Sequence, residues 1–162
     1  MRTGVGYDSH RFDETRPLVL GGVSIPNAPG LKGHSDGDAV AHAITDALLG
    51  AAGLGDIGAL FPDTDPAYEG ADSVELLAQA VCRLREGGLR VVNVDATVIA
   101  ERPRIGPHAE AMRERLGRAL GTGPGGVSVK GKSNEGMGWI GRGEGLAAIA
   151  VATVSGAEGD GD

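Results

Sequence analysis

The start of the chain alternates between polar and apolar residues, and this pattern predicts strands. The alternation from Arg2 to Phe12 has a period of two, so Asp8 and His10 share one face of the expected strand. Two short apolar runs, Val19-Leu20 and Val23-Ser24-Ile25, follow on either side of two glycines. Because glycine pairs between strand-like runs are typical of tight turns, we expect a small N-terminal hairpin here.

Later segments carry apolar residues at helical spacing, separated by β-branched runs. Helices are predicted over 38–52, 73–86 and 107–120, with Asp36 or Asp38 as the cap of the first and Asp72 as the cap of the second. Strands are predicted over 91–100, 127–132 and 146–154. This order predicts one α+β domain over 1–155, with helices packed on one face of a mixed β-sheet, and a disordered acidic tail over 156–162.

The composition indicates which residues form the core of this domain. Glycine accounts for 29 of the 162 residues, about 18% against a usual ~7%, and aromatic residues for only 3%. Leu, Ile, Val and Phe still make up about 23% of the chain, above the roughly 20% below which chains tend to stay disordered. We therefore expect a folded domain whose Ala-rich strands bury little surface per residue, and a subunit interface could supply the missing burial.

The net charge and the single cysteine narrow the function classes. A net charge of −7 argues against nucleic-acid binding through a basic face. Cys82 has no partner for an internal disulfide, which fits a reducing compartment, and its place in an apolar helix predicts a buried thiol. No run approaches the ~18 apolar residues of a membrane span, so a cytoplasmic protein without membrane attachment is expected.

Histidines and carboxylates are concentrated near the N-terminus. Asp8 and His10 lie two residues apart on one strand, and His42 lies on the first helix, one turn from Asp38 and one turn from Asp46. Two imidazoles and one carboxylate leave a coordination position open, as in a catalytic zinc site. Asp38 or Asp46 would then orient the second ring nitrogen of His42. The alternative is a set of ordinary surface histidines beside helix caps.

Several glycine-bounded loops carry polar groups that suit phosphates. They cover 33–35, 55–58 and 131–136, and none matches the Walker pattern, so each loop taken alone also fits a simple turn. Arg102-Pro103-Arg104 is either an anion clamp or a solvated turn. Glu135 either bridges a hard cation to a diphosphate or is an ordinary surface glutamate. The segment between Gly53 and Gly70 is too long for a connector and either is functional or contains a helical turn.

Taken together, six short motifs resemble those of the 2-C-methyl-D-erythritol 2,4-cyclodiphosphate synthase family. The resemblance runs from Met1 to about Ser155 and is most specific between Gly33 and Pro66. The motifs are Asp8-Ser9-His10, Gly33-His34-Ser35-Asp36-Gly37-Asp38, Asp46-Ala47-Leu48-Leu49-Gly50, Gly55-Asp56-Ile57-Gly58, Phe61-Pro62-Asp63-Thr64-Asp65-Pro66 and Gly141-Arg142-Gly143-Glu144-Gly145.

This resemblance implies an activity, an assembly and two cations. The family cyclises 4-diphosphocytidyl-2-C-methyl-D-erythritol 2-phosphate to 2-C-methyl-D-erythritol 2,4-cyclodiphosphate and releases CMP, a phosphorus-oxygen lyase reaction of non-mevalonate isoprenoid biosynthesis. The implied assembly is a homotrimer with active sites between subunits. Zinc would be held by Asp8, His10 and His42, and Mg²⁺ or Mn²⁺ by Glu135. His34 and Ser133 would stabilise charge on the transferred phosphate.

The resemblance also implies which residues contact the substrate. Those around the methylerythritol phosphate are Asp8, Ser9, His10, His34, Ser35, Asp56, Ile57, Gly58, Phe61, Pro62, Asp63, Thr64 and Asp65. Those around the cytidine and its phosphates are Ala100, Glu101, Arg102, Pro103, Arg104, Ile105, Gly106, Lys132, Ser133, Asn134 and Glu135. Trp139 and Arg142 would line a cavity on the trimer axis that can hold an isoprenoid diphosphate. Trp139 replaces a Phe that is common in the family, and Lys132-Ser133-Asn134 replaces a run of threonines.

Two other functions fit the same residues. A zinc-dependent phosphoesterase would use metal-bound hydroxide to hydrolyse a nucleotide diphosphate, and would release a linear bisphosphate beside CMP. A non-catalytic trimer would bind isoprenoid diphosphates through Arg142. The retention of three zinc-type ligands and of Glu135 favours an enzyme over the non-catalytic trimer.

Overall fold

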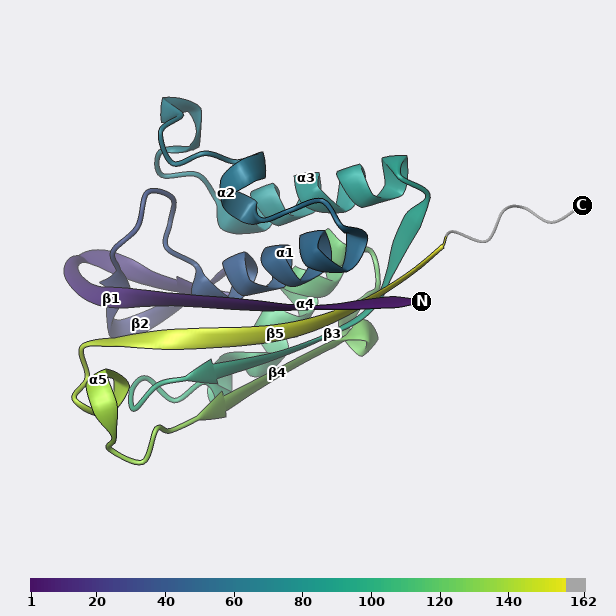
Figure 1. Ribbon diagram of the computed structural model, residues 1–162. Helices are drawn as coiled ribbons and strands as arrows, with labels where there is room; N and C mark the ends of the chain where they lie inside the picture. The colour runs from purple at the N-terminus through teal and green to yellow at the C-terminus, as the bar shows by residue number, and fades with distance from the viewer. Residues whose placement is uncertain (157–162) are drawn as a thin grey trace, which may run out of the picture.

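A five-stranded sheet organises residues 1–156, which are the residues that the computed structural model describes (Figure 1). The strands are β1 (Arg2–Leu20), β2 (Val23–Leu31), β3 (Leu89–Ile99), β4 (Val127–Lys132) and β5 (Gly145–Gly156), in the spatial order β2-β1-β5-β3-β4. Strands β3 and β4 are parallel, and the other neighbouring strands are antiparallel. The prediction of a mixed sheet is therefore confirmed.

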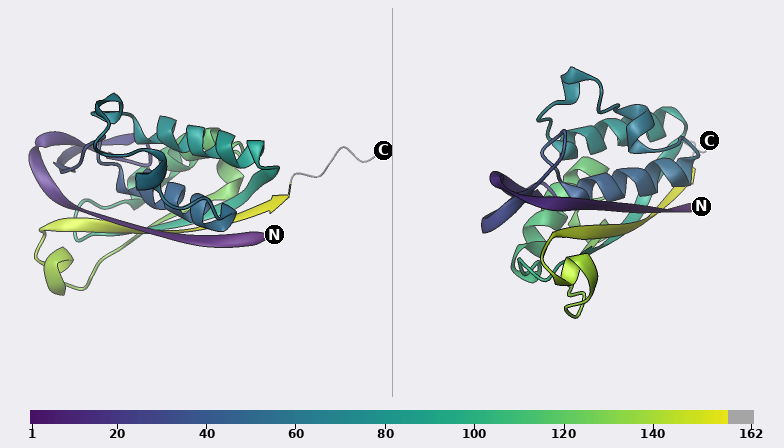
Figure 2. Two further views of the ribbon diagram at one scale, coloured as in Figure 1. Left: turned by 45° about the horizontal axis from the view of Figure 1, so that its top comes forward. Right: turned by 60° about the vertical axis from the view of Figure 1, so that its left-hand side comes forward.

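The three long helices lie on the same face of the sheet (Figures 1 and 2). Helices α1 (Ala39–Ala52) and α4 (Ala109–Leu120) cover it directly, and α3 (Ser73–Glu86) packs against both of them. Shorter turns are α2 (Ile57–Leu60), α5 (Gly138–Gly141) and 3₁₀ turns at Pro66–Tyr68, Gly106–His108 and Pro124–Gly126. The predicted packing of helices on one face of the sheet is confirmed. None of the helices in the described residues is long and apolar enough to cross a membrane.

Several details differ from the sequence predictions. The first strand does not end near Phe12 but continues to Leu20, so the hairpin is long, and β2 runs through Pro26 and Pro29. Because β2 is an edge strand, a proline there removes no essential hydrogen bond. Pro107 belongs to a 3₁₀ turn that precedes α4 rather than to the helix.

Two further predictions concern exposure and the end of the chain. Cys82 is exposed on α3 and is not the buried thiol that was expected, because the buried face of this helix is formed by its neighbours. Gly156, predicted to begin the tail, is the last residue of β5 and pairs with Leu89. The remainder of the predicted acidic tail, 157–162, lies outside the described residues.

Strand β1 and helix α1 approach each other closely through glycine. A Cβ atom on Gly6 would lie 1.9 Å from the carbonyl oxygen of Ala43, and one on Gly4 would lie 2.1 Å from that of Ala47. Real Cβ atoms do not approach backbone so closely, so only glycine allows the helix to rest on this strand. Opposite them, β5 contributes Ala148, Ala150 and Ala152, all fully buried.

Asp38 fixes the start of α1 to the turn of the hairpin. Its side chain accepts hydrogen bonds from the backbone N–H groups of Val40 and Ala41 in the helix and of Gly21 and Gly22 in the turn. Of the two caps allowed by the sequence, the structure therefore uses Asp38. Burial, opposed by these hydrogen bonds and assisted by the charge of Asp36, raises the pKa of Asp38 to about 6.

Replacement of Gly6 by Ala is expected to destabilise the protein strongly, because α1 must move away from β1 to make room for the methyl group. We expect the free energy of unfolding in denaturant to fall by about 3 kcal/mol, as for overpacked cores. The control is Gly50→Ala, at a position inside the same helix where a Cβ meets nothing within 4 Å. That variant should gain about 0.5–1 kcal/mol. Equal stability of the two variants would contradict the close-approach explanation.

Candidate metal centre and active-site cleft

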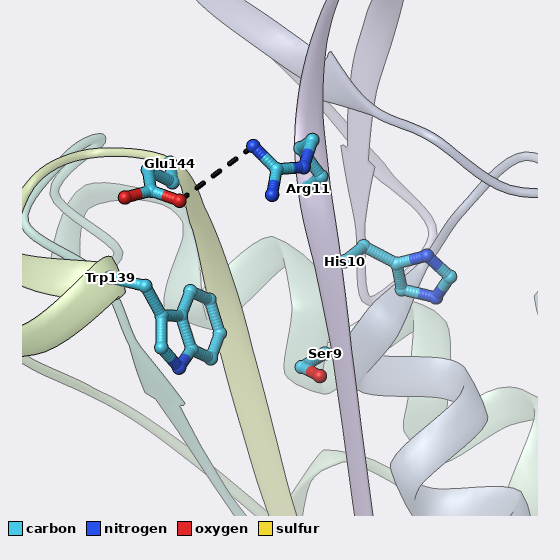
Figure 3. Close-up of a pocket in the computed structure, with 5 residues that line it drawn as sticks. All are labelled: Ser9, His10, Arg11, Trp139 and Glu144. Atoms are coloured by element: carbon cyan, nitrogen blue, oxygen red, sulfur yellow. Dashed lines mark ion pairs between the residues drawn. The ribbon is translucent and has the colours of Figure 1, made fainter.

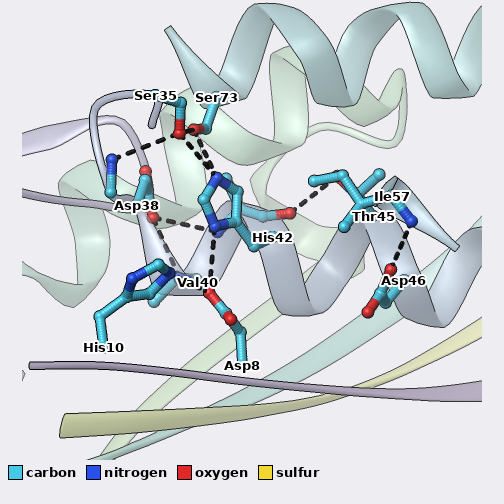
Figure 4. Close-up of polar contacts among 12 residues, drawn as sticks. Asp8, His10, Ser35, Asp38, Val40, His42, Thr45, Asp46, Ile57 and Ser73 are labelled. Atoms are coloured by element: carbon cyan, nitrogen blue, oxygen red, sulfur yellow. Dashed lines mark hydrogen bonds and ion pairs between the residues drawn. The ribbon is translucent and has the colours of Figure 1, made fainter. Parts of the chain in front are cut away.

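Three side chains converge between β1 and α1. Asp8 and His10 point from alternate positions of β1 toward His42 on α1 (Figure 4). Asp8 Oδ2 lies 2.8 Å from His10 Nε2 and 3.0 Å from His42 Nδ1, and one ligand atom from each residue lies within 4.8 Å of the others. The constellation expected from sequence spacing is therefore assembled by the fold.

Hydrogen bonds and burial prepare His10 to bind a cation. Its Nδ1 lies 2.6 Å from the carbonyl oxygen of Lys32, and because a carbonyl only accepts, Nδ1 carries the proton of the neutral ring, in which Nε2 has the lone pair. Nε2 is close to Asp8 but not oriented to form a hydrogen bond, so within residues 1–156 it is a buried nitrogen without a hydrogen-bond partner. A metal ion would satisfy it.

The electrostatics of the triad agree with this reading. Burial opposes ionisation of Asp8, but the close contact with His10, the hydrogen bond with His42 and the charges of both rings outweigh it and lower the pKa of Asp8. Contact with the Asp8 carboxylate in turn raises the pKa of His10, against the opposing effect of burial. Two imidazoles and one ionised carboxylate are a donor set that fits a divalent metal.

The outer nitrogen of His42 has partners that the sequence did not indicate. Neither Asp38 nor Asp46 contacts it, because Asp38 caps α1 and Asp46 accepts a hydrogen bond from the backbone N–H of Ile57. Instead, His42 Nε2 lies 2.8 Å from Ser73 Oγ and 3.0 Å from Ser35 Oγ. The prediction that Asp38 or Asp46 orients His42 was therefore wrong, and Ser73 was missed because it lies 31 residues away on another helix.

A cavity of about 430 Å³ opens above the triad. Its wall joins the loop around His34 to α2 and to the 3₁₀ turn that follows it. Phe61 and Tyr68 form an edge-to-face ring pair with centroids 5.3 Å apart on this wall. The lining residues are Asp8, His10, Gly33, His34, Ser35, His42, Asp46, Ile57, Gly58, Phe61, Asp63, Tyr68 and Leu76.

Most of the expected methylerythritol-phosphate contacts lie in this cleft or beside it. Asp56 and Asp65 do not line it but cap α2 and the 3₁₀ turn through their side chains, and Pro62 and Thr64 are exposed beside them. His34 Nε2 lies 3.2 Å from the carbonyl oxygen of Asp65, which ties the two cleft walls together. Tyr68 and Leu76 line the cleft although no sequence motif marked them.

The expected nucleotide contacts form a separate group within one chain. Glu101 Oε1 accepts hydrogen bonds from the backbone N–H groups of Asn134 and Gly136, at 2.9 and 3.1 Å, which joins the ends of β3 and β4. Ser133 Oγ donates to Glu135 Oε1 at 2.9 Å. A second cavity is lined by Asn27, Ala28, Pro29, Glu101, Arg102, Pro103 and Arg104, and it shares no residue with the cavity at the triad.

Trp139 and Arg142 lie beside β1 and β5, apart from both the cleft at the triad and the expected nucleotide contacts. A shallow cavity of about 190 Å³ is lined by Ser9, His10, Arg11, Trp139 and Glu144 (Figure 3). Arg142 is absent from this lining and instead pairs with Glu144 at 2.7 Å, which lowers the pKa of that carboxyl group. Ser9 is exposed and lines this cavity rather than the metal cleft.

Comparison with known proteins places this geometry in a family. The model of the YgbB family matches residues 1–155. The chain belongs to the YgbB family. Among its curated relatives, a 2-C-methyl-D-erythritol 2,4-cyclodiphosphate synthase of Gemmatimonas aurantiaca is 62% identical over 154 residues, covering 95% of this chain and 93% of the relative. The family expected from the six motifs is thus confirmed.

Solved structures of related proteins share the fold. A 2C-methyl-D-erythritol-2,4-cyclodiphosphate synthase in its CDP-bound form is 40% identical, with a TM-score of 0.86 over 95% of this YgbB-family chain and 100% of the other. The bifunctional IspDF of Campylobacter jejuni is 45% identical, with a TM-score of 0.92 over 96% of this chain. This chain spans 42% of the length of that bifunctional protein.

In this YgbB-family chain, metal binding at the triad is expected to release a proton and to weaken as the pH falls. Contact with Asp8 raises the pKa of His10, so the metal-free protein holds a proton there above the ordinary histidine pKa of about 6.5. An arriving cation displaces this proton. Below the raised pKa, the apparent Kd for Zn²⁺ should therefore rise about tenfold per pH unit.

Isothermal titration calorimetry in buffers of different ionisation enthalpy measures this proton release directly. Asp8→Asn provides the comparison, because without the carboxylate His10 loses the contact that holds its proton. A Zn²⁺ affinity that stays constant between about pH 5 and 8 would contradict proton competition at His10.

Proposed function

We propose that this chain cyclises 4-diphosphocytidyl-2-C-methyl-D-erythritol 2-phosphate to 2-C-methyl-D-erythritol 2,4-cyclodiphosphate and releases CMP. The observation that carries the proposal is the Asp8, His10 and His42 triad at the base of a cleft, in a chain that belongs to the family of these synthases. The single cysteine fits a reducing compartment, so we place the activity in the cytoplasm.

The reaction is an in-line displacement at phosphorus. An oxygen of the 2-phosphate bonds to the β-phosphorus, the bond from the β-phosphorus to the bridging oxygen breaks, and CMP leaves with that oxygen. No protein nucleophile is required. Both partners are anions and the chain itself has a net charge of −7, so they repel each other and need local positive charge. When bound, zinc at the triad and Mg²⁺ or Mn²⁺ at Glu135 supply that charge.

The residues of the chain position the reacting groups. His34 lines the cleft, and its contact with the Asp65 carbonyl holds the loop of residues 33–35 beside the 3₁₀ turn. Because that carbonyl only accepts, Nε2 carries a proton, and a phosphate oxygen that replaces the carbonyl would receive this hydrogen bond as charge develops. The Phe61 and Tyr68 rings limit water access on the opposite wall. Ser133, among the residues expected around the nucleotide, would likewise donate a hydrogen bond from its hydroxyl group to the transferred phosphate.

The separation of the two residue groups supports a homotrimer with shared active sites. Within one chain the metal cleft and the nucleotide group have no lining residue in common. The open face of the sheet carries Val5, Tyr7, Ile149 and Val151, with 68, 55, 39 and 41% of their surface exposed. Such an apolar patch is typical of a subunit interface. In the proposed trimer, each metal cleft faces the nucleotide group of a neighbouring subunit.

The third cavity fits the proposed trimer axis. Trp139 and Glu144 line it beside the same open sheet face, and Arg142 is held next to it by Glu144. A ring of three such arginines around a symmetry axis would attract a diphosphate, and the indole ring would contact an apolar chain. We therefore propose this site for an isoprenoid diphosphate.

His42→Ala is expected to abolish CMP release while the protein stays folded, because a triad of three ligands loses one of them. The assay measures CMP together with the second product. A cyclic diphosphate supports the synthase, whereas a linear bisphosphate would establish the phosphoesterase. If the wild-type protein loaded with metal shows no turnover, the result would instead support the non-catalytic trimer. His108→Ala, a histidine outside the triad, is the matched control and should retain activity.

Mixing two inactive variants tests the shared site. His42→Ala removes the metal side, and Glu135→Gln removes the nucleotide side, so random reassembly of equal amounts should restore about a quarter of the wild-type sites. The mixture is unfolded and refolded together, and CMP release is compared with each variant refolded alone. A monomeric mass in solution, or a mixture as inactive as its components, would contradict active sites shared between subunits.

A further inference from the structure

Strand β1 contains three residues that have no counterpart on β2. Asp13 pairs with Gly30 and Pro17 pairs with Pro29, so residues 14–16 form a bulge on β1. Extra residues of this kind turn a side chain out of the regular alternation of a strand, and they are frequent beside active sites. Arg16 is the last residue of this bulge.

The neighbours of the bulge fix its shape. Asp13 Oδ1 accepts hydrogen bonds from the backbone N–H and the hydroxyl group of Thr15, at 2.9 and 2.6 Å. Pro17 restricts the backbone of the residue before it, Arg16, to extended conformations. A Cβ atom on Gly30 would lie 2.4 Å from the carbonyl oxygen of Pro17 and 2.5 Å from that of Arg16, so only glycine lets β2 approach the bulge this closely.

The guanidinium group of Arg16 holds the loop that carries His34. Its Nη1 donates a hydrogen bond to the carbonyl oxygen of Gly33 at 2.6 Å, and its Nη2 donates one to that of Ser35. Between them, the carbonyl oxygen of His34 accepts the backbone N–H of Gly70 at 2.9 Å. Three successive carbonyl groups of the loop are therefore held, two by β1 and one by the segment before α3.

We propose that Arg16 is a positioning residue, which clamps the backbone on both sides of His34 and so keeps His34 and Ser35 in place on the wall of the cleft. Arg16 acts through the loop and is not among the residues that line the cleft. Its planar fork of nitrogen atoms suits two acceptors at once, which a lysine ammonium group does not. The effect on the reaction rests on the proposed function, whereas the clamp itself does not.

The loop needs such a clamp because it has no regular structure of its own. Residues 33–36 belong to neither a helix nor a strand, so no ladder of backbone hydrogen bonds fixes them. In the proposed reaction, His34 donates a hydrogen bond to a phosphate oxygen as charge develops, and such a donor acts only from a defined position. A shift of the loop would therefore lower the rate of the chemical step more than the binding of substrate.

The kinetics of Arg16→Ala and Arg16→Lys test the clamp. Because misplacement of a group that acts in the transition state lowers turnover, Arg16→Ala should reduce kcat for CMP release about 100-fold and change KM far less. Arg16→Lys keeps the positive charge but has one nitrogen in place of the fork, so it should lose most of the same activity. Wild-type kcat in Arg16→Lys would overturn a clamp that depends on two nitrogen atoms.

Arg113→Ala is the matched control, because Arg113 holds two backbone carbonyl groups in the same way elsewhere in the fold. Its Nε donates to the carbonyl oxygen of Val127 at 2.9 Å, and its Nη2 donates to that of Pro124 at 3.0 Å. Both arginines are partly buried. Arg113→Ala should therefore lose comparable stability in denaturant and retain wild-type kcat. An equal loss of kcat in the two alanine variants would indicate a general structural effect and overturn the proposal.

Added guanidinium ion separates the clamp from a loss of folding. In Arg16→Ala, millimolar guanidinium chloride, far below denaturing concentrations, can occupy the space of the missing side chain and bridge the same two carbonyl groups. It should raise the kcat of Arg16→Ala in a saturable way and leave that of Arg113→Ala unchanged. Sodium chloride at the same ionic strength should not rescue Arg16→Ala. Equal effects of the two salts would contradict a specific role for the planar cation.

A measurement without substrate keeps this inference distinct from the proposed function. The backbone amide NMR signals of residues 33–35 should shift in Arg16→Ala, return toward wild type with guanidinium and stay unchanged in Arg113→Ala. Unchanged signals in Arg16→Ala would overturn the clamp. If Arg16→Ala fails to fold, altered signals in Arg16→Lys support the clamp and wild-type signals overturn it. If wild type releases no CMP, the proposed function fails, while these signals still decide whether the clamp exists.

Discussion

The contact between β1 and α1 is the constraint on which the site depends. Side chains larger than hydrogen at positions 4 and 6 would force the helix away from the strand. With glycine at both, the helix lies low enough for His42 to reach Asp8 and His10, which follow Gly6 on the same face of β1. The geometry of the candidate metal centre therefore depends on this backbone packing.

Internal carboxylates then organise the loop above this contact. The carboxylates of Asp36 and Asp38 accept hydrogen bonds from backbone N–H groups, and Asp36 also accepts one from the Ser73 hydroxyl. Two of the chain's acidic residues therefore serve as structural hydrogen-bond acceptors. Arg16 fastens the same loop from the other side through the carbonyl oxygens of Gly33 and Ser35. A short loop with this many fixed contacts presents His34 and Ser35 to the cleft in a defined geometry.

Sequence patterns predicted much of this because their signals are local. The helix over 38–52 and the pairing of Asp8 with His10 follow from spacing, and both were found. The length of β1 was missed because its irregular register near Pro17 breaks the alternation. The contacts of Ser73 and Tyr68 were missed because they depend on how distant segments pack, which spacing does not record. The residues expected around the nucleotide were predicted by resemblance, but the separation of this group from the cleft could only be seen in the structure.

The pairing of β1 with β5 has a consequence for how this chain can vary. Ten consecutive residues of β1 pair in register, from Arg2 with Val154 to Arg11 with Gly145. Insertion or deletion of one residue inside this stretch would exchange the two faces of the strand. Asp8 and His10 would turn to the open face, and Val5 or Tyr7 would turn toward α1, where only glycine fits. Homologues that keep this site are therefore expected to vary β1 by substitution and to confine changes of length to its two ends.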